Sequence, residues 1–272
     1  MSDKGLRDVS VRDLTVEFSS GAGSVRAVDN VSLDIRPGET FGIVGQSGVG
    51  KSLFVRSLVN LVPKPGRITR GRITIAGQDL LSLDPAGLRR LRGRHVGVIV
   101  QNARIHLNPV LSVGKQIANV YLAHHKATRR EAWDRGLEML RSVGIPGPQE
   151  RMHAYPHELS GGMVQRIIIA MALICGPSVV LADEPTSGLD VTIQDQVLRL
   201  FRDLVTGAGA SALLVTRDMG IVANFCDRVG VMDHGRLVEV AAVSEIFTGA
   251  VQPQTKALLA AASLSQSRAE AN

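Results

Sequence analysis

Aromatic residues and cysteines are scarce in this sequence. Phe, Trp and Tyr make up 3% of its 272 residues, and the two cysteines, Cys175 and Cys226, lie in apolar surroundings without CxxC spacing. The low aromatic content disfavours a single-stranded nucleic-acid binder, because such proteins stack bases on aromatic rings. The cysteine pattern disfavours a disulfide framework or a metal site, and it indicates two structural thiols in a reducing compartment.

Long apolar segments are missing as well. The first ten residues contain no apolar stretch, so we expect no signal peptide. The longest apolar run, residues 167–182, is interrupted by Gly176-Pro177 and is shorter than the roughly 20 residues of a spanning helix. We therefore expect any role at a membrane to depend on a partner protein.

The residues that are present suffice for a folded core. The chain is 44% hydrophobic and 21% charged, which excludes a disordered protein. Its net charge of +6 allows an anionic partner such as a nucleotide, a phospholipid headgroup or a nucleic acid. A solvated basic surface is the simpler interpretation of the charge taken alone.

Strand and helix patterns alternate at both ends of the chain and predict an α/β fold with a parallel sheet. The predicted strands lie near residues 9–18, 28–35, 41–44, 71–76, 96–100, 179–182, 212–215 and 229–232. The predicted helices lie near residues 52–62, 112–143, 161–174, 191–205 and 218–225. We expect a helical subdomain at about 103–177, inserted into a core of about 1–102 and 178–250, and a short disordered tail at 263–272.

A glycine-rich loop between a predicted strand and a predicted helix matches the Walker A pattern, Gly45-x-x-x-x-Gly50-Lys51-Ser52. Such a loop turns its N–H groups toward a phosphate, and the following helix adds its positive dipole end. Lys51 would reach the β- and γ-phosphates, and Ser52 would bind Mg²⁺. A glycine-rich turn that happens to precede Lys-Ser is disfavoured by the flanking elements. The predicted nucleotide-binding residues here are Gly45, Gln46, Ser47, Gly48, Val49, Gly50, Lys51, Ser52 and Leu53.

Two carboxylates follow the apolar strand at 179–182. Asp183 and Glu184 would lie at the carboxyl edge of the parallel sheet. Asp183 is suited to hold Mg²⁺ through water, and Glu184 is placed to act as general base on an attacking water. Taken alone, the pair fits an ordinary strand end with helix-capping acids equally well. The Walker A pattern favours the functional interpretation.

A second anion-binding helix start follows from Leu159-Ser160-Gly161-Gly162, which precedes an apolar helix. The chain thus has two predicted anion-binding helix starts but only one pair of carboxylates at a strand end. This suggests that the helix start at residues 160–162 binds the nucleotide of another subunit. Here the sequence resembles the ATP-binding subunits of ABC transporters, over residues 9–262. The resemblance implies a P-loop NTPase core with an antiparallel β edge subdomain, all within one ATP-binding domain at 1–262.

The same resemblance assigns roles to further residues. Gln101 resembles the Q-loop glutamine, which contacts the metal and the site of hydrolysis. Residues 187–190 resemble the D-loop, and Phe18 resembles the aromatic residue that stacks on adenine. The closer similarity is to the peptide and nickel importer branch, on the segments Ala27-Val28-Asp29, Leu107-Asn108-Pro109, Tyr155-Pro156-His157-Glu158 and Gln254-Thr255-Lys256-Ala257-Leu258-Leu259.

The switch position departs from the family pattern. Arg217 stands where the family has a switch histidine that contacts the γ-phosphate. A guanidinium can donate to phosphate but is permanently charged and cannot accept a hydrogen bond. We expect Arg217 to act in the site, with Glu184 and Gln101, but to support hydrolysis poorly. The alternative is that the site tolerates the change.

The resemblance also implies an assembly. Two ATP-binding subunits would pair head to tail, with ATP and Mg²⁺ between the Walker A loop, Gln101 and Asp183 of one chain and Ser160, Gly161 and Gly162 of the other. Importers of this branch usually combine two different ATP-binding subunits, so we expect a heterodimer, with a homodimer as the alternative. Transmembrane permease subunits would be direct partners at the cytoplasmic face of the membrane, and an extracytoplasmic solute-binding protein an indirect one.

Two other functions compete with this interpretation. A soluble ABC-type ATPase acting on DNA or ribosomes fits the basic charge, but the chain has one nucleotide domain, no long coiled coil and few aromatics. We therefore expect no nucleic-acid partner. A P-loop kinase or GTPase would leave residues 159–162 unexplained, and no Asn-Lys-x-Asp guanine-binding motif is present. Peptide, nickel and metal chelate stay open as the transported cargo.

Overall fold

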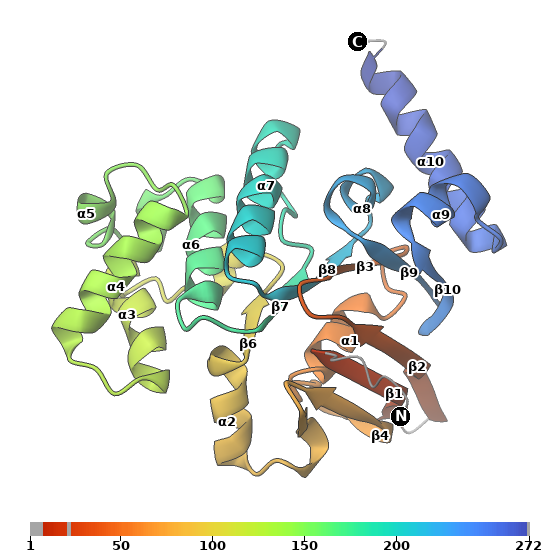
Figure 1. Cartoon of the computed structure of the whole chain (residues 1–272), viewed down its shortest axis with the longest axis horizontal. Helices are drawn as coiled ribbons and strands as arrows, with labels where there is room; N and C mark the ends of the chain where they lie inside the picture. Colours follow the sequence, from red (N-terminus) through yellow and green to blue (C-terminus); the bar gives the residue numbers. More distant parts are fainter. Residues whose placement is uncertain (1–7, 21–22, 271–272) are drawn as a thin grey trace. The chain divides into compact units, whose positions relative to one another are not determined.

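The computed structural model describes residues 8–20 and 23–270 (Figure 1). The chain folds into two compact units. The first contains the chain up to Leu83 and from Ser211 onward, and the second contains Asp84–Ala210. The predicted helical subdomain at about 103–177 falls inside the second unit, and its own boundaries stay a prediction.

The first unit contains an antiparallel sheet with the strand order β2-β1-β4-β5. Its strands are β1 (Val9–Ser20), β2 (Gly23–Ile35), β4 (Gly66–Ile75) and β5 (Gln78–Asp79), and the short 3-10 helix η1 (Leu80–Ser82) follows. The pairing of β1 shifts register between Val11 and Leu14, where Asp13 has a φ of 49°. This irregularity interrupts the alternation of buried and exposed side chains along β1, and the predicted antiparallel edge is confirmed.

The same unit contains four strands in the order β10-β9-β3-β8. They are β3 (Thr40–Val44), β8 (Ser211–Thr216), β9 (Arg228–Asp233) and β10 (Arg236–Ala242). β3 runs parallel to both β8 and β9, and β10 is antiparallel to β9. The side chains of β8 are all buried, as expected for a strand of a parallel sheet that is covered on both faces.

Helices of the first unit are α1 (Lys51–Ser57), α8 (Met219–Phe225), α9 (Val243–Gly249) and α10 (Pro253–Glu270). α10 packs with Leu258 and Leu259 against a buried cluster that includes Val44, Val231 and Ile246. Residues 263–270 continue this helix, and residues 271–272 of the expected disordered tail lie outside the described residues. Helix-favouring Ala, Leu, Gln and Arg residues without Gly or Pro let the helix continue.

The second unit is mainly helical. It contains α2 (Pro85–Arg94), η2 (Ala103–His106), α3 (Val113–His124), α4 (Arg129–Ser142), α5 (Pro148–Arg151), η3 (Pro156–Glu158), α6 (Gly161–Leu173) and α7 (Val191–Gly207). Two parallel strands, β6 (Val96–Ile99) and β7 (Val179–Asp183), pair within it. No helix in the described residues has the length and apolar character needed to cross a bilayer.

Candidate functional site

The loop between β3 and α1 depends on glycines at its first and last positions. A Cβ on Gly45 would lie 2.2 Å from the carbonyl oxygen of Met232. Gly50 has a φ of 108°, and a Cβ there would lie 2.4 Å from the carbonyl oxygen of Ala27. Neither position accepts a larger residue without moving the backbone of β9 or β2, so the loop path is set by these contacts.

Lys51 begins α1 and folds under its own loop. Its side chain is buried, and Nζ donates to the carbonyl oxygens of Gly45 and Gln46, each at 2.7 Å. The ammonium group therefore lies against the backbone that forms the loop. The helix that follows directs its first N–H groups to the same place, an arrangement suited to an anionic phosphate.

The turn between β9 and β10 holds the loop from one side. The N–H of Gly235 donates to the carbonyl oxygen of Val49 at 2.9 Å, and the carbonyl oxygen of Gly235 accepts from Asp29 N–H at 2.9 Å. The carboxylate of Asp29 in turn accepts from Arg236 Nε. The sequence contained no signal for this support, because its residues are about 20 and nearly 200 positions away from the loop.

Arg217 leaves its strand at the same edge as the loop. Thr216 is the register partner of Val44 in the parallel pair of β8 and β3, so Arg217 and Gly45 follow directly from neighbouring strand ends. The turn after Arg217 is tied by Asp218, whose N–H donates to Thr216 Oγ1 and whose carboxylate caps α8 at Gly220. The Arg217 side chain is exposed.

Phe18 lies on β1 against the backbone of β4. It pairs with Gly66, and a Cβ at Gly66 would lie 2.5–2.9 Å from the Phe18 ring atoms. On its other side Phe18 pairs with Val25 of β2, two residues before Ala27, whose carbonyl oxygen borders Gly50. The ring is half-exposed and belongs to the same unit as the loop.

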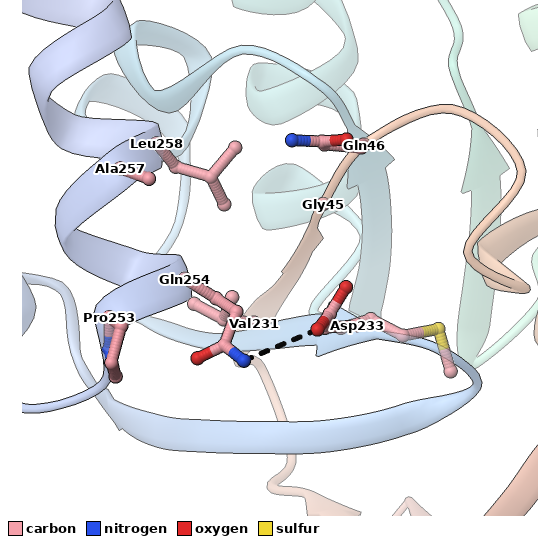
Figure 2. A pocket seen from close by; sticks show the side chains of 9 residues that line it. Gly45, Gln46, Val231, Asp233, Pro253, Gln254, Ala257 and Leu258 are labelled. Atoms are coloured by element: carbon pink, nitrogen blue, oxygen red, sulfur yellow. Dashed lines mark hydrogen bonds between the residues drawn. The ribbon is translucent and has the colours of Figure 1, made fainter.

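A cavity of about 300 Å³ opens beside the first residues of the loop (Figure 2). Gly45 and Gln46 form one wall, the end of β9 another, and the start of α10 the third. Gln254 Nε2 donates to Asp233 Oδ2 at 3.3 Å across its floor, and Leu258 of α10 points into it in Figure 2. The C-terminal helix therefore contributes directly to the surroundings of the glycine-rich loop, which sequence patterns did not reveal.

In the second unit, a glutamine and a carboxylate face each other at two strand ends. Ile99 of β6 pairs with Ala182 of β7, which places Gln101 and Glu184 at the same edge. Gln101 Nε2 donates to Glu184 Oε2 at 2.9 Å and to Ser187 Oγ at 3.4 Å. Glu184 has a φ of 44°, an uncommon conformation for this residue, and Asp183 beside it is 5% exposed.

The start of α6 presents an exposed helix end. Ser160 caps it by accepting from Met163 N–H, and Ser160 and Gly161 are exposed. A Cβ on Gly162 would lie 2.9 Å from Ile193 of α7, so close packing also requires a glycine there. Arg104 of η2 donates to the carbonyl oxygen of Leu159 at 2.8 Å, a contact that links the residues after Gln101 to this helix start.

The predicted site residues thus fall into two groups. The loop from Gly45 to Leu53, Phe18 and Arg217 all lie in the first unit. The structure brings Gln101 and Glu184 together in the second unit, which also contains Asp183 and the start of α6.

The two cysteines are not part of either group. Both are partly buried, and burial raises the pKa of Cys175 to about 11 and that of Cys226 to about 12, so both thiols stay protonated at neutral pH. Within the described residues, no cluster of three or more His, Cys, Asp or Glu side chains could hold a metal ion.

Comparison with known proteins agrees with these features. Residues 28–187 match the family described as ABC transporter. The chain is 44% identical to the oligopeptide transport ATP-binding protein OppD of Bacillus subtilis, over 93% of this chain and 71% of that protein. It is 45% identical to the dipeptide transport ATP-binding protein DppD of the same organism, over 92% of this chain and 75% of that protein.

A solved structure shares the fold. The dimeric ATP-binding cassette MJ0796, in a post-hydrolysis state bound to ADP and Pi, superposes with a TM-score of 0.77 at 27% identity. The superposition covers 86% of this chain and 98% of the other. The predicted P-loop NTPase fold is confirmed, and a kinase or GTPase of another family is excluded. The chain belongs to the ABC transporter family, and it is an ATP-binding subunit with the ATPase fold of that family.

Proposed function

We propose that this chain is the ATP-hydrolysing motor subunit of an importer that carries peptides across the cytoplasmic membrane. The observation that carries the proposal is its 44–45% identity, over more than nine-tenths of the chain, to subunits named for oligopeptide and dipeptide transport. Nickel and metal chelates are the other cargoes of the importer branch that the sequence resembles. The relatives of this chain are named for transport, which disfavours a soluble ATPase acting on nucleic acid.

The glycine-rich loop holds the phosphates of ATP in this proposal. Gly45 to Leu53 supply backbone N–H groups, and Lys51 exchanges its two loop carbonyl contacts for phosphate oxygens. Phe18, seated on Gly66, stacks on the adenine ring. The partner subunit would close the site with the helix start formed by Ser160, Gly161 and Gly162, where Ser160 and Gly161 are exposed and the helix end is suited to a γ-phosphate.

The groups around Glu184 perform the hydrolysis. Glu184 accepts a proton from the attacking water, and its hydrogen bond from Gln101 orients the carboxylate for that task. The uncommon φ of Glu184 turns the side chain out of the strand direction, which supports a functional role. Arg217 donates to the γ-phosphate but cannot accept from the water, so it stabilises bound ATP more than it assists hydrolysis.

Magnesium fits the residues assigned to it. The Ser52 hydroxyl, the Gln101 amide oxygen and the Asp183 carboxylate are oxygen donors of the kind Mg²⁺ prefers, completed by water and phosphate oxygens. Asp183 is 5% exposed at the end of β7, a position where a nearly buried carboxylate gains from a cation. When bound, the ion neutralises charge on the phosphates.

The assembly places this subunit at the cytoplasmic face of the membrane. It pairs head to tail with a second ATP-binding subunit, a different chain or a copy of itself, and the pair docks on transmembrane permease subunits. An extracytoplasmic solute-binding protein delivers the cargo to those permeases. Closure on ATP and reopening after hydrolysis drive alternating access in the permeases.

Uptake assays in a deletion strain test this function. The wild-type gene should restore accumulation of a labelled dipeptide, and Glu184→Gln should abolish uptake while the purified variant still binds ATP. Gln196→Glu, on the exposed surface of α7, serves as a control for a change of one charge. If the gene restores nickel uptake but not dipeptide uptake, the cargo is nickel and not a peptide. If a fully assembled complex takes up neither, the proposal is refuted.

A further inference from the structure

The positive charge of the chain is concentrated in one segment. Residues 85–130 contain nine Lys or Arg residues and four His, and they contain no Asp or Glu. The rest of the chain has 22 Lys or Arg against 25 Asp or Glu, a balance of −3. The net charge of +6 therefore comes entirely from this segment, which includes α2 and α3.

The segment forms a basic cavity in the second unit. α2 packs on α3, and a hollow of about 670 Å³ lies between them, lined by Pro85, Ala86, Arg89, Arg90, Arg92 and His124. Arg89, Arg90 and the nearby Arg94 are exposed. We call this hollow, together with Arg94, the α2–α3 pocket.

A kink in α2 shapes the pocket. Arg92 has a ψ of 121° and Gly93 a φ of 91°, so the helix breaks there. A Cβ on Gly93 would lie 2.4 Å from His124 Nε2, which shows that the imidazole of α3 rests on the glycine. Burial, followed by the charges of His125, Arg89 and Arg94, lowers the pKa of His124. Burial and the neighbouring positive charges therefore both favour the neutral imidazole.

No carboxylate neutralises three of these arginines. Within the described ranges, Arg89, Arg90 and Arg94 form no ion pair, whereas Arg12 and Arg228 of the first unit are paired with Asp34 and Glu39. Unpaired guanidinium groups around a hollow are suited to bidentate contacts with phosphate oxygens.

We propose that the α2–α3 pocket binds the phosphate headgroups of anionic phospholipids. Exposed guanidinium groups are screened by water and bind a single small anion weakly. A membrane surface presents many phosphates at once, so several arginines act together, each adding to the attraction. The choice of a lipid as the ligand rests on the proposed function, in which the chain lies at the membrane. The pocket would give the subunit a lipid contact in addition to its contact with the permease.

Vesicle binding by the full chain tests the proposal. The protein should sediment with vesicles of phosphatidylcholine and phosphatidylglycerol, should not sediment with phosphatidylcholine alone, and should dissociate as salt is raised. The triple variant Arg89→Gln, Arg90→Gln, Arg94→Gln should bind the anionic vesicles at least about tenfold more weakly. A matched variant with Arg36, Arg67 and Arg70 replaced by Gln removes three exposed charges from the first unit and should bind almost as the wild type does.

Three results would overturn the inference. Equal losses in the two triple variants would mean that overall charge, not the pocket, attracts the vesicles. Saturable binding of inorganic pyrophosphate at the pocket, without vesicle binding, would assign it to a soluble anion. Unchanged vesicle binding in the pocket variant, together with loss of the permease on purification, would assign it to a protein contact. Vesicle binding is measured without cargo, so failure of the peptide-uptake test would leave this result unaffected.

Discussion

At the residue scale, the contact between Phe18 and Gly66 gives a test of adenine binding. Gly66→Ala should displace the Phe18 ring from its position over residue 66, since the new Cβ would lie 2.5–2.9 Å from ring atoms. Base–aromatic stacking is worth about 1–3 kcal/mol, so we expect ATP to bind several-fold more weakly. Titration with a fluorescent ATP analogue measures the effect.

Triphosphate without the base is the control for this prediction. Its affinity should be the same in the wild type, in Gly66→Ala and in Phe18→Ala, because the glycine-rich loop is untouched. If both variants bind ATP as tightly as the wild type, Phe18 does not stack on the adenine.

Arg217 is the second residue whose role is open to measurement. Arg217→His restores a side chain that both donates and accepts, so ATP turnover in the assembled complex should rise several-fold with little change in ATP affinity. Arg217→Lys keeps the charge and should not raise turnover. A histidine variant that hydrolyses ATP no faster than the wild type would show that the site tolerates arginine.

At the scale of elements, the attachment of α10 depends on one carboxylate. Glu239 of β10 accepts from the N–H groups of Val251 and Gln252, at 2.9 and 3.1 Å, and from the hydroxyl of the buried Thr255. Burial alone raises the pKa of Glu239, but the bond from Thr255, the two N–H groups and the charge of Lys256 outweigh it and lower the pKa. The ionised form is therefore the one that holds the helix.

We predict that Glu239→Gln loosens α10, because an amide has one acceptor oxygen and no charge. The loss should be about 1 kcal/mol, as for other helix-start contacts. A carboxylate with a lowered pKa stabilises the fold above its unfolded-state pKa, and this contribution disappears as pH falls through the folded value. The difference in unfolding free energy between wild type and variant, from urea titrations, should thus be present at neutral pH and vanish in acid.

Glu245 offers the control for this element. It caps α9 through the N–H of Ala242, and Glu245→Gln should leave hydrogen exchange in α10 unchanged. Faster exchange in α10 for Glu239→Gln alone is the expected result. If exchange in α10 is equal in the wild type and both variants, the helix is held by its apolar contacts with Leu258 and Leu259 instead.

At the scale of the whole molecule, the proposed head-to-tail pair predicts complementation between defective chains. Lys51→Ala removes the phosphate contact, and Ser160→Arg blocks the helix start of α6, so either variant alone should be inactive. A mixture of the two contains dimers with one intact composite site, and its ATPase activity should partly recover. A mixture as inactive as its parts would mean that each chain completes its own site or pairs only with a different subunit.

Much of the fold and of the candidate site could be predicted because the signals are local. A strand, a glycine-rich turn and a helix follow one another at residues 41–57, and the carboxylates come directly after a buried strand. Turn residues and hydrophobic periodicity depend on only a few neighbouring residues, so they can be recognised in the sequence.

The linear pattern of the chain was therefore enough to identify the family and the α/β class, and it indicated the residues proposed to bind phosphate. Other features appear only in the folded chain. Gly235 supports Val49, and Gln101 bonds Glu184. Glu239 holds α10, and the arginines of α2 surround a hollow beside His124. The physical reason is separation along the chain. Each of these pairs joins segments at least a dozen positions apart, and only folding brings their polar groups within hydrogen-bonding distance or leaves their charges unpaired.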